Sequence, residues 1–426
     1  MSSVAQPTRL AGLRYGALGF PLAFVALPLY VYMPAYYAAQ FGASLAALGT
    51  VLLLVRVFDA VTDPLMGFAA DRLLSMQPTI RLMALGLGSF LLLAGFVGLF
   101  FPPLWARGSQ GALLVWCAAM LVVTYLAYSA LTITHQAWAA RLQGGDLAQS
   151  HWVSWREAAT LLGVLTASVL PSVAGMPATA GLLGAVLLLA WLALKGAPLP
   201  GALSSLTAAE FSFRRLGQPW RGSAFRGLMA VFLLNGIASA IPATLLLFFV
   251  NDRLQAQGWE GLFLAAYFAC AAVSLPLWVR LVARVGLGKG WLSGMLLAIL
   301  SFAGAVFLGS GDIWPFLLIC MASGLALGAD LALPTPLLAR VIRQESSLEG
   351  TEGAYFGWWN SASKLNLALA AGLVLPLLQA LGYRPGQQSE EGLLALTLAY
   401  AVVPCVLKLL AWIALWRWRQ RWDKES

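Results

Sequence analysis

Two aspartates, Asp59 and Asp63, lie four residues apart in an otherwise apolar run of the sequence, and Arg56 precedes Asp59 by three residues. If the run is a helix, all three side chains share one face and the two carboxylates lie one turn apart. A charge at bilayer depth costs at least about 2.5 kcal/mol, so such residues normally face a protein interior or a water-filled path. The spacing predicts a site for a coupling cation in a membrane transporter.

The composition indicates which elements must position these carboxylates. The chain has 426 residues, 60% of them hydrophobic and 10% charged, and its mean hydropathy is +0.81. A spanning helix needs about 20 mostly apolar residues. Unbroken apolar runs at 82–101 and 181–194 argue against a closed barrel of alternating strands, the other structure that satisfies the backbone in lipid. The sequence therefore predicts an all-α membrane protein.

The apolar runs predict twelve transmembrane helices in two pseudo-symmetric six-helix bundles. We place the spans at 13–38, 44–70, 81–102, 111–138, 152–174, 178–195, 223–250, 260–282, 290–309, 313–338, 353–381 and 391–416. The longest break between apolar runs, 196–222, is rich in Gly, Pro, Ser and Arg. It is predicted to be a cytoplasmic linker between an N-terminal bundle at 1–195 and a C-terminal bundle at 223–426.

An internal repeat supports this division. Residues 63–72 and 275–284 share a proline, a leucine and a final arginine at the same offsets. Many secondary transporters are built from such repeats, with the substrate site at the repeat interface. The positions that match Asp59 and Asp63 hold Ala271 and Leu275. The cation site is therefore assigned to the first half.

The basic residues predict the orientation. With these spans, twenty of the 26 Lys and Arg residues fall on the side that both termini share, and Arg107, Arg253 and Arg384 fall on the other. This is the positive-inside pattern, so we expect both termini in the cytoplasm of a bacterial-type inner membrane. The net charge of +9 then needs no nucleic-acid partner. The expected partners are the lipid bilayer, a small solute and a cation, and the protein is expected to be a monomer.

The fourth span is unusually polar. Ser129, Thr132 and Gln136 are three and four residues apart, so they share a face. Trp138 lies close by, and His135 is on a neighbouring face. Polar side chains can also simply bridge helices, for about 0.6 kcal/mol on average. For His135 we favour that bridging role over a proton relay.

The fifth span opens with Arg156 and Glu157. Because adjacent helical residues do not face each other, we expect the two side chains to reach different neighbours. One of them is expected to face the central cavity.

The second half offers other polar positions. Asn235 lies on a mostly apolar run, and Asp330 is followed by a Pro-Thr-Pro sequence that should break the helix. Lys364 lies about 16 Å into its span, with Asn360 on the same face, which favours a cavity-facing lysine. Lys408 is nearer the cytoplasmic end and is expected to snorkel to the interface.

Three stretches together resemble the glycoside-pentoside-hexuronide:cation symporter family, the group of the melibiose permease within the major facilitator superfamily. They are RVFDAVTDPLMG at 56–67, Arg156 before the Leu-Leu-Gly at 161–163, and GAYFG at 353–357 leading to Ser-Lys-Leu at 363–365. The resemblance covers nearly the whole chain and implies the major facilitator fold.

The resemblance also implies roles. Asp59 and Asp63 match carboxylates that bind the coupling Na+, Li+ or H+. Arg156 matches an arginine at the sugar site, and Lys364 matches a lysine that links the two halves.

The chain also departs from that permease. The permease has an adjacent lysine and aspartate near the sugar in its first span, where this chain has Phe-Pro-Leu at 20–22. Its fourth-span aspartate, shared between cation and sugar, corresponds to Thr132, and a nearby tryptophan corresponds to Gln136. The galactoside contacts are thus unmatched, and the cation site has one ligand fewer.

The choice of ion follows from this loss. Two carboxylates one turn apart in a low dielectric cannot both ionise cheaply, so one of them is suited to carry a proton. Na+ would need oxygen ligands from the hydroxyls of Thr62, Ser129 or Thr132. We favour H+ over Na+, although Arg56 would hold a carboxylate ionised and favour Na+ instead.

The sequence thus predicts a cation-coupled secondary active transporter of a sugar, glycoside or similar small polar solute, with alternating access and no cofactor beyond the coupling H+ or Na+. The predicted cation site comprises Asp59, Asp63, Thr62, Ser129 and Thr132. The predicted solute contacts are Arg156, Lys364, Gln136, Trp138, Asn235 and Asn360.

Three other functions were weighed. A non-sugar solute, such as a drug, a lipid or an organic anion, is the main alternative. A membrane enzyme is disfavoured because the sequence has no paired His/Cys metal spacing, no Gly-rich phosphate loop and no serine with a base in reach. A receptor or scaffold would predict that neutralising Asp59 and Asp63 leaves the function intact.

Overall fold

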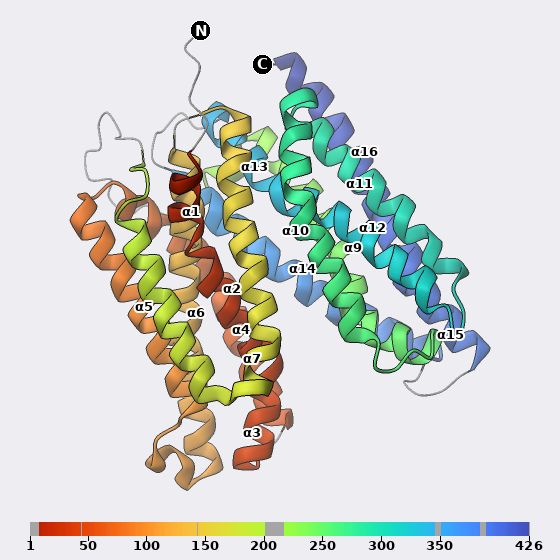
Figure 1. Ribbon diagram of the computed structural model, residues 1–426, viewed down its shortest axis with the longest axis horizontal. Helices are drawn as coiled ribbons and strands as arrows, with labels where there is room; N and C mark the ends of the chain where they lie inside the picture. Colours follow the sequence, from red (N-terminus) through yellow and green to blue (C-terminus); the bar gives the residue numbers. More distant parts are fainter. Residues whose placement is uncertain are drawn as a thin grey trace. The chain divides into compact units, whose positions relative to one another are not determined.

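The structure is a computed structural model, and it describes residues 8–43, 45–142, 144–200, 217–345, 351–383 and 389–425. Over these ranges all regular structure is helical (Figure 1). Arg384 and most of the predicted linker, 201–216, lie outside the described residues.

The chain divides into two compact units. The first is Met1–Gln218 together with Ser346–Ser361, and the second is Pro219–Glu345 together with Ala362–Ser426. The helices of the first unit are α1 (Arg9–Gly16), α2 (Gly19–Leu27), α3 (Met33–Phe41), α4 (Leu45–Leu74), α5 (Pro78–Phe100), α6 (Gln110–Arg141) and α7 (Asp146–Leu194). The helices of the second unit are α9 (Ser223–Phe248), α10 (Glu260–Val285), α11 (Leu287–Ala303), α12 (Ile313–Ala332), α13 (Pro334–Glu345), α15 (Glu390–Thr397) and α16 (Val403–Glu425).

Helix α14 (Glu352–Ala380) begins in the first unit and continues in the second. Single π-helical turns continue three of the other helices, at Pro28–Tyr32 after α2, Phe249–Arg253 after α9 and Leu398–Val402 after α15. Short 3-10 turns lie at Leu104–Gly108, Pro219–Arg221 and Gly304–Phe307.

Helix α7 contains the fifth and sixth predicted spans. Its helical geometry is interrupted at Gly175, whose φ of +76° lies in the left-handed region that favours glycine. Pro177 follows closely and has no N–H to donate to the preceding turn. The predicted break between these spans is confirmed at this place.

Eight segments of the described residues are helices long and apolar enough to cross a membrane. The other four predicted spans fall in α1 to α3, in α4, in the first part of α7 and in α14. Three of these four carry charged residues of the predicted site, namely Asp59 and Asp63 in α4, Arg156 in α7 and Lys364 in α14. These spans are long enough to cross a membrane but also contain charged residues.

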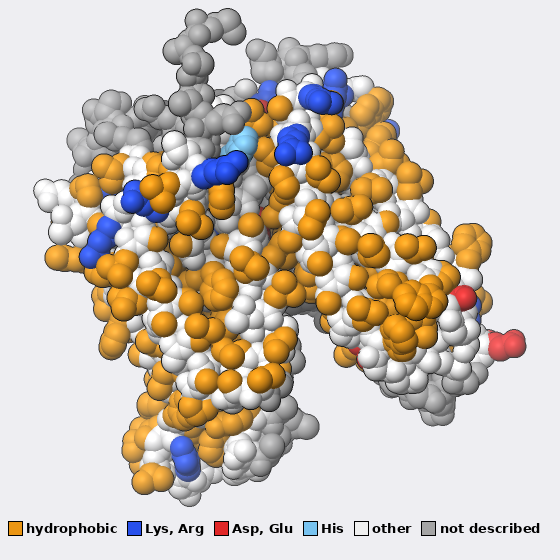
Figure 2. All heavy atoms as spheres, viewed as in Figure 1, with side chains coloured by type: hydrophobic (Ala, Val, Ile, Leu, Met, Phe, Trp, Pro, Cys, Tyr) orange, Lys and Arg blue, Asp and Glu red, His pale blue; other side chains and the backbone are white. Residues whose placement is uncertain are grey.

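The flanks of the molecule are apolar. Figure 2 shows hydrophobic side chains over the sides and Lys and Arg side chains gathered toward the upper end of the view. Leu104, Val173 and Phe307 are 83%, 78% and 86% exposed. Exposed apolar surface on this scale marks contact with another apolar phase. Together with the spanning helices, it makes this a multi-pass membrane protein.

The tenth predicted span is interrupted where the Pro-Thr-Pro sequence predicts it. Helix α12 ends at Ala332, and α13 begins at Pro334. Asp330 therefore lies in the last turn of α12. In that position it is close to α9, α11 and α16.

Candidate functional site

The two aspartates of α4 are buried inside the first unit. Asp59 is 3% exposed and Asp63 is 0% exposed. The hydroxyl of Ser129, on α6, donates to Asp59 Oδ1 at 2.9 Å, and the Thr62 hydroxyl donates to the Asp59 carbonyl at 3.0 Å. Of the predicted hydroxyl ligands, Ser129 thus bonds to the Asp59 carboxylate, whereas Thr62 bonds to the Asp59 backbone, and Asp63 lies one turn further along α4.

The polar face of α6 continues beyond Ser129. The side chain of Gln136 accepts a 2.7 Å hydrogen bond from Asn360, at the start of α14. Thr132 lies between Ser129 and Gln136, and its Oγ1 is buried with no hydrogen-bond partner among the described residues. This face therefore joins two predicted solute residues to the predicted cation residues within the first unit.

Glycines allow α4 and the start of α14 to touch backbone to backbone. A Cβ atom on Gly67 would lie 2.1 Å from the Gly353 carbonyl oxygen, and one on Gly357 would lie 2.7 Å from the Asp63 carbonyl oxygen. No side chain fits at such distances, so glycine is required at these positions. The hydroxyl of Ser361 adds a 2.9 Å hydrogen bond to the carbonyl of Ala60. The backbone beside Asp63 is thus fixed by α14.

A network of ion pairs and hydrogen bonds joins α4 to the start of α14 one turn after Gly67. The Asp71 carboxylate accepts the backbone N–H groups of Gly353 at 2.6 Å and Ala354 at 3.0 Å, at the N-terminus of α14. Arg141 bonds to both Asp71 and Glu352, at 2.8 Å each. A carboxylate at a helix N-terminus satisfies unpaired N–H groups and complements the helix dipole. Sequence reasoning missed this network, although Asp71 lies within the repeat at residues 63–72.

The expectation that Arg156 and Glu157 reach different neighbours was wrong. Arg156 Nε and Nη2 lie 2.9 and 2.5 Å from Glu157 Oε1. Both residues are buried, and two charges buried side by side are less costly as a pair than apart. The remaining Nη1 of Arg156 is buried without a hydrogen-bond partner among the described residues. It is the donor through which this arginine can bind a further group.

Trp138 contacts other residues of the first unit, and two further predicted solute residues, Asn235 and Lys364, belong to the second unit. The indole N–H of Trp138 donates to the Pro198 carbonyl at 2.9 Å, and the guanidinium of Arg81 lies 5.1 Å from its ring centroid. Asn235 belongs to the second unit, where it bonds to Asp330. Lys364 lies half-buried on the part of α14 that belongs to the second unit.

The prediction that Lys408 snorkels to the interface was also wrong. Its ammonium donates to Asp330 Oδ2 at 2.8 Å and to the Ser239 hydroxyl at 3.0 Å. Asp330 Oδ1 accepts two further bonds, from Asn235 at 3.1 Å and from the Trp291 indole at 2.8 Å. The helix break after Asp330 places this carboxylate within reach of α16. The nearby carboxylate offered the lysine a partner inside the protein.

The histidine of the fourth span is tied into packing. His135 Nε2 lies 2.8 Å from the backbone carbonyl of Tyr15, and the Tyr15 hydroxyl donates to the His135 carbonyl at 2.8 Å. These reciprocal bonds join α1 to α6 and agree with the bridging role that the sequence favoured.

Comparison with known proteins decides the family. Residues 14–419 match the sequence pattern described as MFS/sugar transport protein, where MFS denotes the major facilitator superfamily. The chain belongs to this family. It is a major facilitator transporter, not an enzyme, and the predicted fold class is confirmed.

Individual relatives are distant but cover more than nine-tenths of the chain. The glucuronide carrier protein homolog of Escherichia coli is 24% identical over 91% of this chain and 87% of that protein. This match supports the predicted resemblance to the glycoside-pentoside-hexuronide family. Among solved structures, a bacterial homologue of the iron transporter ferroportin in its outward-facing state is 19% identical, with a TM-score of 0.69 over 97% of this chain and all of that one. The Escherichia coli fucose:proton symporter is 14% identical, with a TM-score of 0.68 over 95% and 99%. These structures share the fold.

Proposed function

We propose that this transporter couples the uptake of a glycoside or hexuronide to a cation, H+ in preference to Na+, and that Asp59 and Asp63 bind the cation. The supporting observation is the burial of two carboxylates on successive turns of a membrane helix, against a hydroxyl from a second helix. Keeping such groups at bilayer depth is costly, and a site that takes up and releases a cation is a function that explains the cost.

The solute class is proposed from the similarity to the glucuronide carrier protein homolog. A glucuronide presents hydroxyls, a ring oxygen and a carboxylate, which calls for hydrogen-bonding side chains and a buried cation. The side chains of Gln136 and Asn360 supply the hydrogen-bonding groups. The guanidinium of Arg156, whose Nη1 has no hydrogen-bond partner among the described residues, supplies the buried cation. We further propose a monomer in a bacterial-type inner membrane, with both termini in the cytoplasm, from the distribution of Lys and Arg.

The α4 and α14 contact gives alternating access a physical basis. Asp71 holds the first N–H groups of α14, and the glycines allow the two backbones to touch. We propose that this contact breaks and re-forms during transport, and that cation binding at Asp63, whose own carbonyl lies in the contact, biases the two states.

Uptake by proteoliposomes tests this proposal. Vesicles with an imposed pH or Na+ gradient should accumulate a labelled glucuronide, and a solute panel should rank hexuronides above neutral hexoses. Asp59→Asn should abolish accumulation, while Glu391→Gln, which neutralises an exposed carboxylate on α15, should not. Accumulation by Asp59→Asn equal to that of the wild type would overturn the coupling site. Transport of other solutes but no sugar or glycoside would overturn the solute class.

A further inference from the structure

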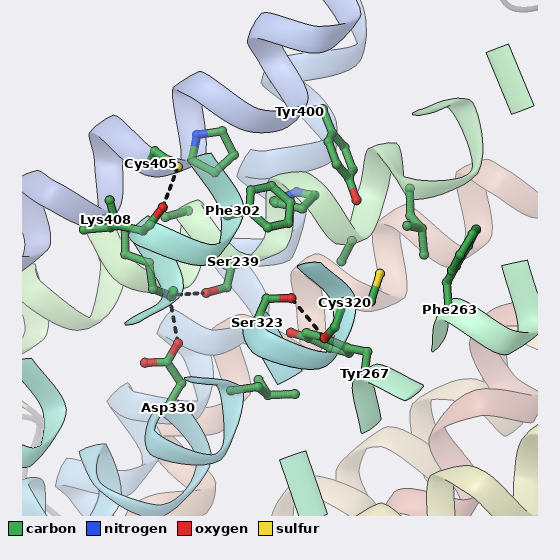
Figure 3. Close-up of a pocket in the computed structure, with 18 of the residues that line it drawn as sticks. Ser239, Phe263, Tyr267, Phe302, Cys320, Ser323, Asp330, Tyr400, Cys405 and Lys408 are labelled. Atoms are coloured by element: carbon green, nitrogen blue, oxygen red, sulfur yellow. Dashed lines mark hydrogen bonds and ion pairs between the residues drawn. The ribbon is translucent and has the colours of Figure 1, made fainter. Parts of the chain in front are cut away.

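The second unit contains a cavity of about 190 Å³ whose lining includes none of the residues proposed above to bind the cation or the solute. Residues from α9, α10, α11, α12 and α16, and from the turn before α16, line it. Figure 3 shows Asp330, Lys408 and Ser239 gathered at one end, while Phe263 and Tyr400 lie toward the other. The cavity is therefore amphiphilic, with a polar and an apolar end.

At the polar end, the carboxylate is already satisfied. Asp330 accepts bonds from Lys408, Asn235 and the Trp291 indole. The Lys408 ammonium has three N–H groups, and it uses two of them on Asp330 and Ser239. The pair therefore has no net charge, and one N–H donor of Lys408 remains for a ligand.

Tyr267 supplies a second donor at this end. Figure 3 shows its hydroxyl directed toward the Asp330 and Lys408 end of the cavity, and among the described residues none hydrogen-bonds to it. The available groups at the polar end thus donate hydrogen bonds. They favour a ligand atom that accepts them, such as a carbonyl or ether oxygen.

The remaining walls are mainly apolar, with several aromatic rings among aliphatic side chains. They include the rings of Phe263, Phe268, Phe302 and Tyr400, together with Leu246 and Ile299. Aromatic walls favour an aromatic guest through edge-to-face and offset contacts. An apolar cavity of about 150 Å³ holds benzene, so this cavity takes one ring with a short substituent.

Charge decides between ligands of this size. An anionic ligand would place a third charge beside an ion pair that is already balanced, and burial of an uncompensated charge is costly. A cationic ligand would compete with Lys408 for Asp330 and would leave the ammonium unpaired. A neutral ligand meets neither penalty.

We propose that this cavity is a binding site for a neutral, single-ring aromatic compound with one hydrogen-bond acceptor. The acceptor binds between Lys408 and Tyr267, and the ring packs among Phe263, Phe302 and Tyr400. The site lies wholly within the second unit and is independent of Asp59 and Asp63. Loss of cation coupling therefore leaves it intact.

A fluorine NMR titration of the purified full-length protein in detergent micelles tests the proposal. The probe is 4-fluoroacetophenone, compared with 4-fluoroethylbenzene, which lacks the acceptor, and with 4-fluorobenzoate, which is an anion. Saturable binding should follow the order ketone, hydrocarbon, anion. Tyr267→Phe should reduce the preference for the ketone over the hydrocarbon by about three- to tenfold, the value of one hydrogen bond.

Filling the cavity should remove the site. Ala298→Phe, on the α11 wall, should weaken ketone binding by about tenfold or more, because the new ring takes the place of the ligand. Leu300→Phe is the matched control, since Leu300 is 67% exposed on the same helix and does not line the cavity. Ala243→Phe fills the cavity from α9, and it replaces Ala298→Phe in the test if that variant does not fold.

Three results would overturn the proposal. The first is ketone binding that neither filling variant weakens, or no saturable binding at all. The second is benzoate binding more tightly than the ketone, which would make the cavity an anion site. The third is a phospholipid that copurifies with the wild type and with Leu300→Phe but not with Ala298→Phe, which would assign the cavity to an acyl chain.

Discussion

The two units each bury carboxylates among apolar helices, but they surround them differently. In the first unit, Asp59 accepts a bond from the Ser129 hydroxyl, and Asp63 lies one turn away. In the second, Asp330 accepts bonds from an ammonium, an amide and an indole. In the second unit the Lys408 ammonium lies 2.8 Å from Asp330 Oδ2 and balances its charge. In the first unit the Ser129 hydroxyl places an oxygen atom 2.9 Å from Asp59 Oδ1, where it can contribute to the ligands of a bound cation.

This difference teaches that burial of an acid does not by itself identify a coupling site. The groups that satisfy the carboxylate also matter, because they decide whether its charge is permanent or exchanged. We propose a structural role for the Asp330 and Lys408 pair, beside the coupling role proposed for Asp59 and Asp63. Four changes test this contrast.

The largest expected effect is on stability, in the second unit. Asp330→Asn should lower the free energy of unfolding by about 3–5 kcal/mol, because it leaves the Lys408 charge buried without its counterion. Combining Asp330→Asn with Lys408→Met should restore most of the loss. Denaturant titrations in detergent micelles measure both. If Asp330→Asn alone were as stable as the wild type, the pair would have no structural role.

The same type of change in the first unit should affect coupling more than stability. Asp63→Asn should reduce gradient-driven uptake by about 10- to 150-fold, the value of one hydrogen-bonded charge. Initial rates in proteoliposomes measure this effect, and thermal unfolding serves as the control. A large loss of stability with normal uptake would reverse the contrast between the two units.

An intermediate effect is expected where α4 touches α14. Gly67→Ala places a methyl group within 2.1 Å of the Gly353 carbonyl oxygen, so it should separate the helices at a cost of about 1–3 kcal/mol. Gly49→Ala on the same helix meets nothing within 4 Å and is the matched control. We expect slowed transport and faster protease cleavage at the start of α14 for the first variant alone. Equal behaviour of the two would show that the contact is not required.

The smallest effect is expected from the hydroxyl beside Asp59. Ser129→Ala removes one hydrogen bond, so the apparent affinity for the coupling cation should fall by about two- to tenfold, with the maximal rate preserved. Uptake measured against pH or Na+ concentration reports this shift. A loss of maximal rate with unchanged cation affinity would place Ser129 outside the cation site.

Much of the fold could be predicted because hydropathy and charge are strong local signals. The apolar runs predicted the membrane helices and the break at Gly175, and the Pro-Thr-Pro sequence predicted the break after Asp330. The spacing of Asp59 and Asp63 predicted a shared face, and the spacing of Ser129 and Gln136 predicted one on α6. These predictions depend only on residues within one helix.

The site could be predicted only in part because its partners come from distant parts of the chain. Nothing local pairs Lys408 with Asp330, or Arg141 with Asp71 and Glu352, since 70 or more residues separate each pair. The rule that adjacent helical residues diverge failed at Arg156 because its long side chain can turn back to Glu157. Trp138 shares a helix with the site, but its indole bonds to Pro198 after α7 instead.

The most direct test is proton movement during solute uptake. Proteoliposomes are loaded with a pH-sensitive dye and prepared without any ion gradient across the membrane. Glucuronide is then added outside, so that it flows inward down its own concentration gradient. We expect the interior to acidify with the wild type, and Asp59→Asn to exchange labelled for unlabelled glucuronide without any pH change. Acidification by Asp59→Asn at the wild-type rate, with solute uptake intact, would contradict the assignment of the coupling site to this carboxylate.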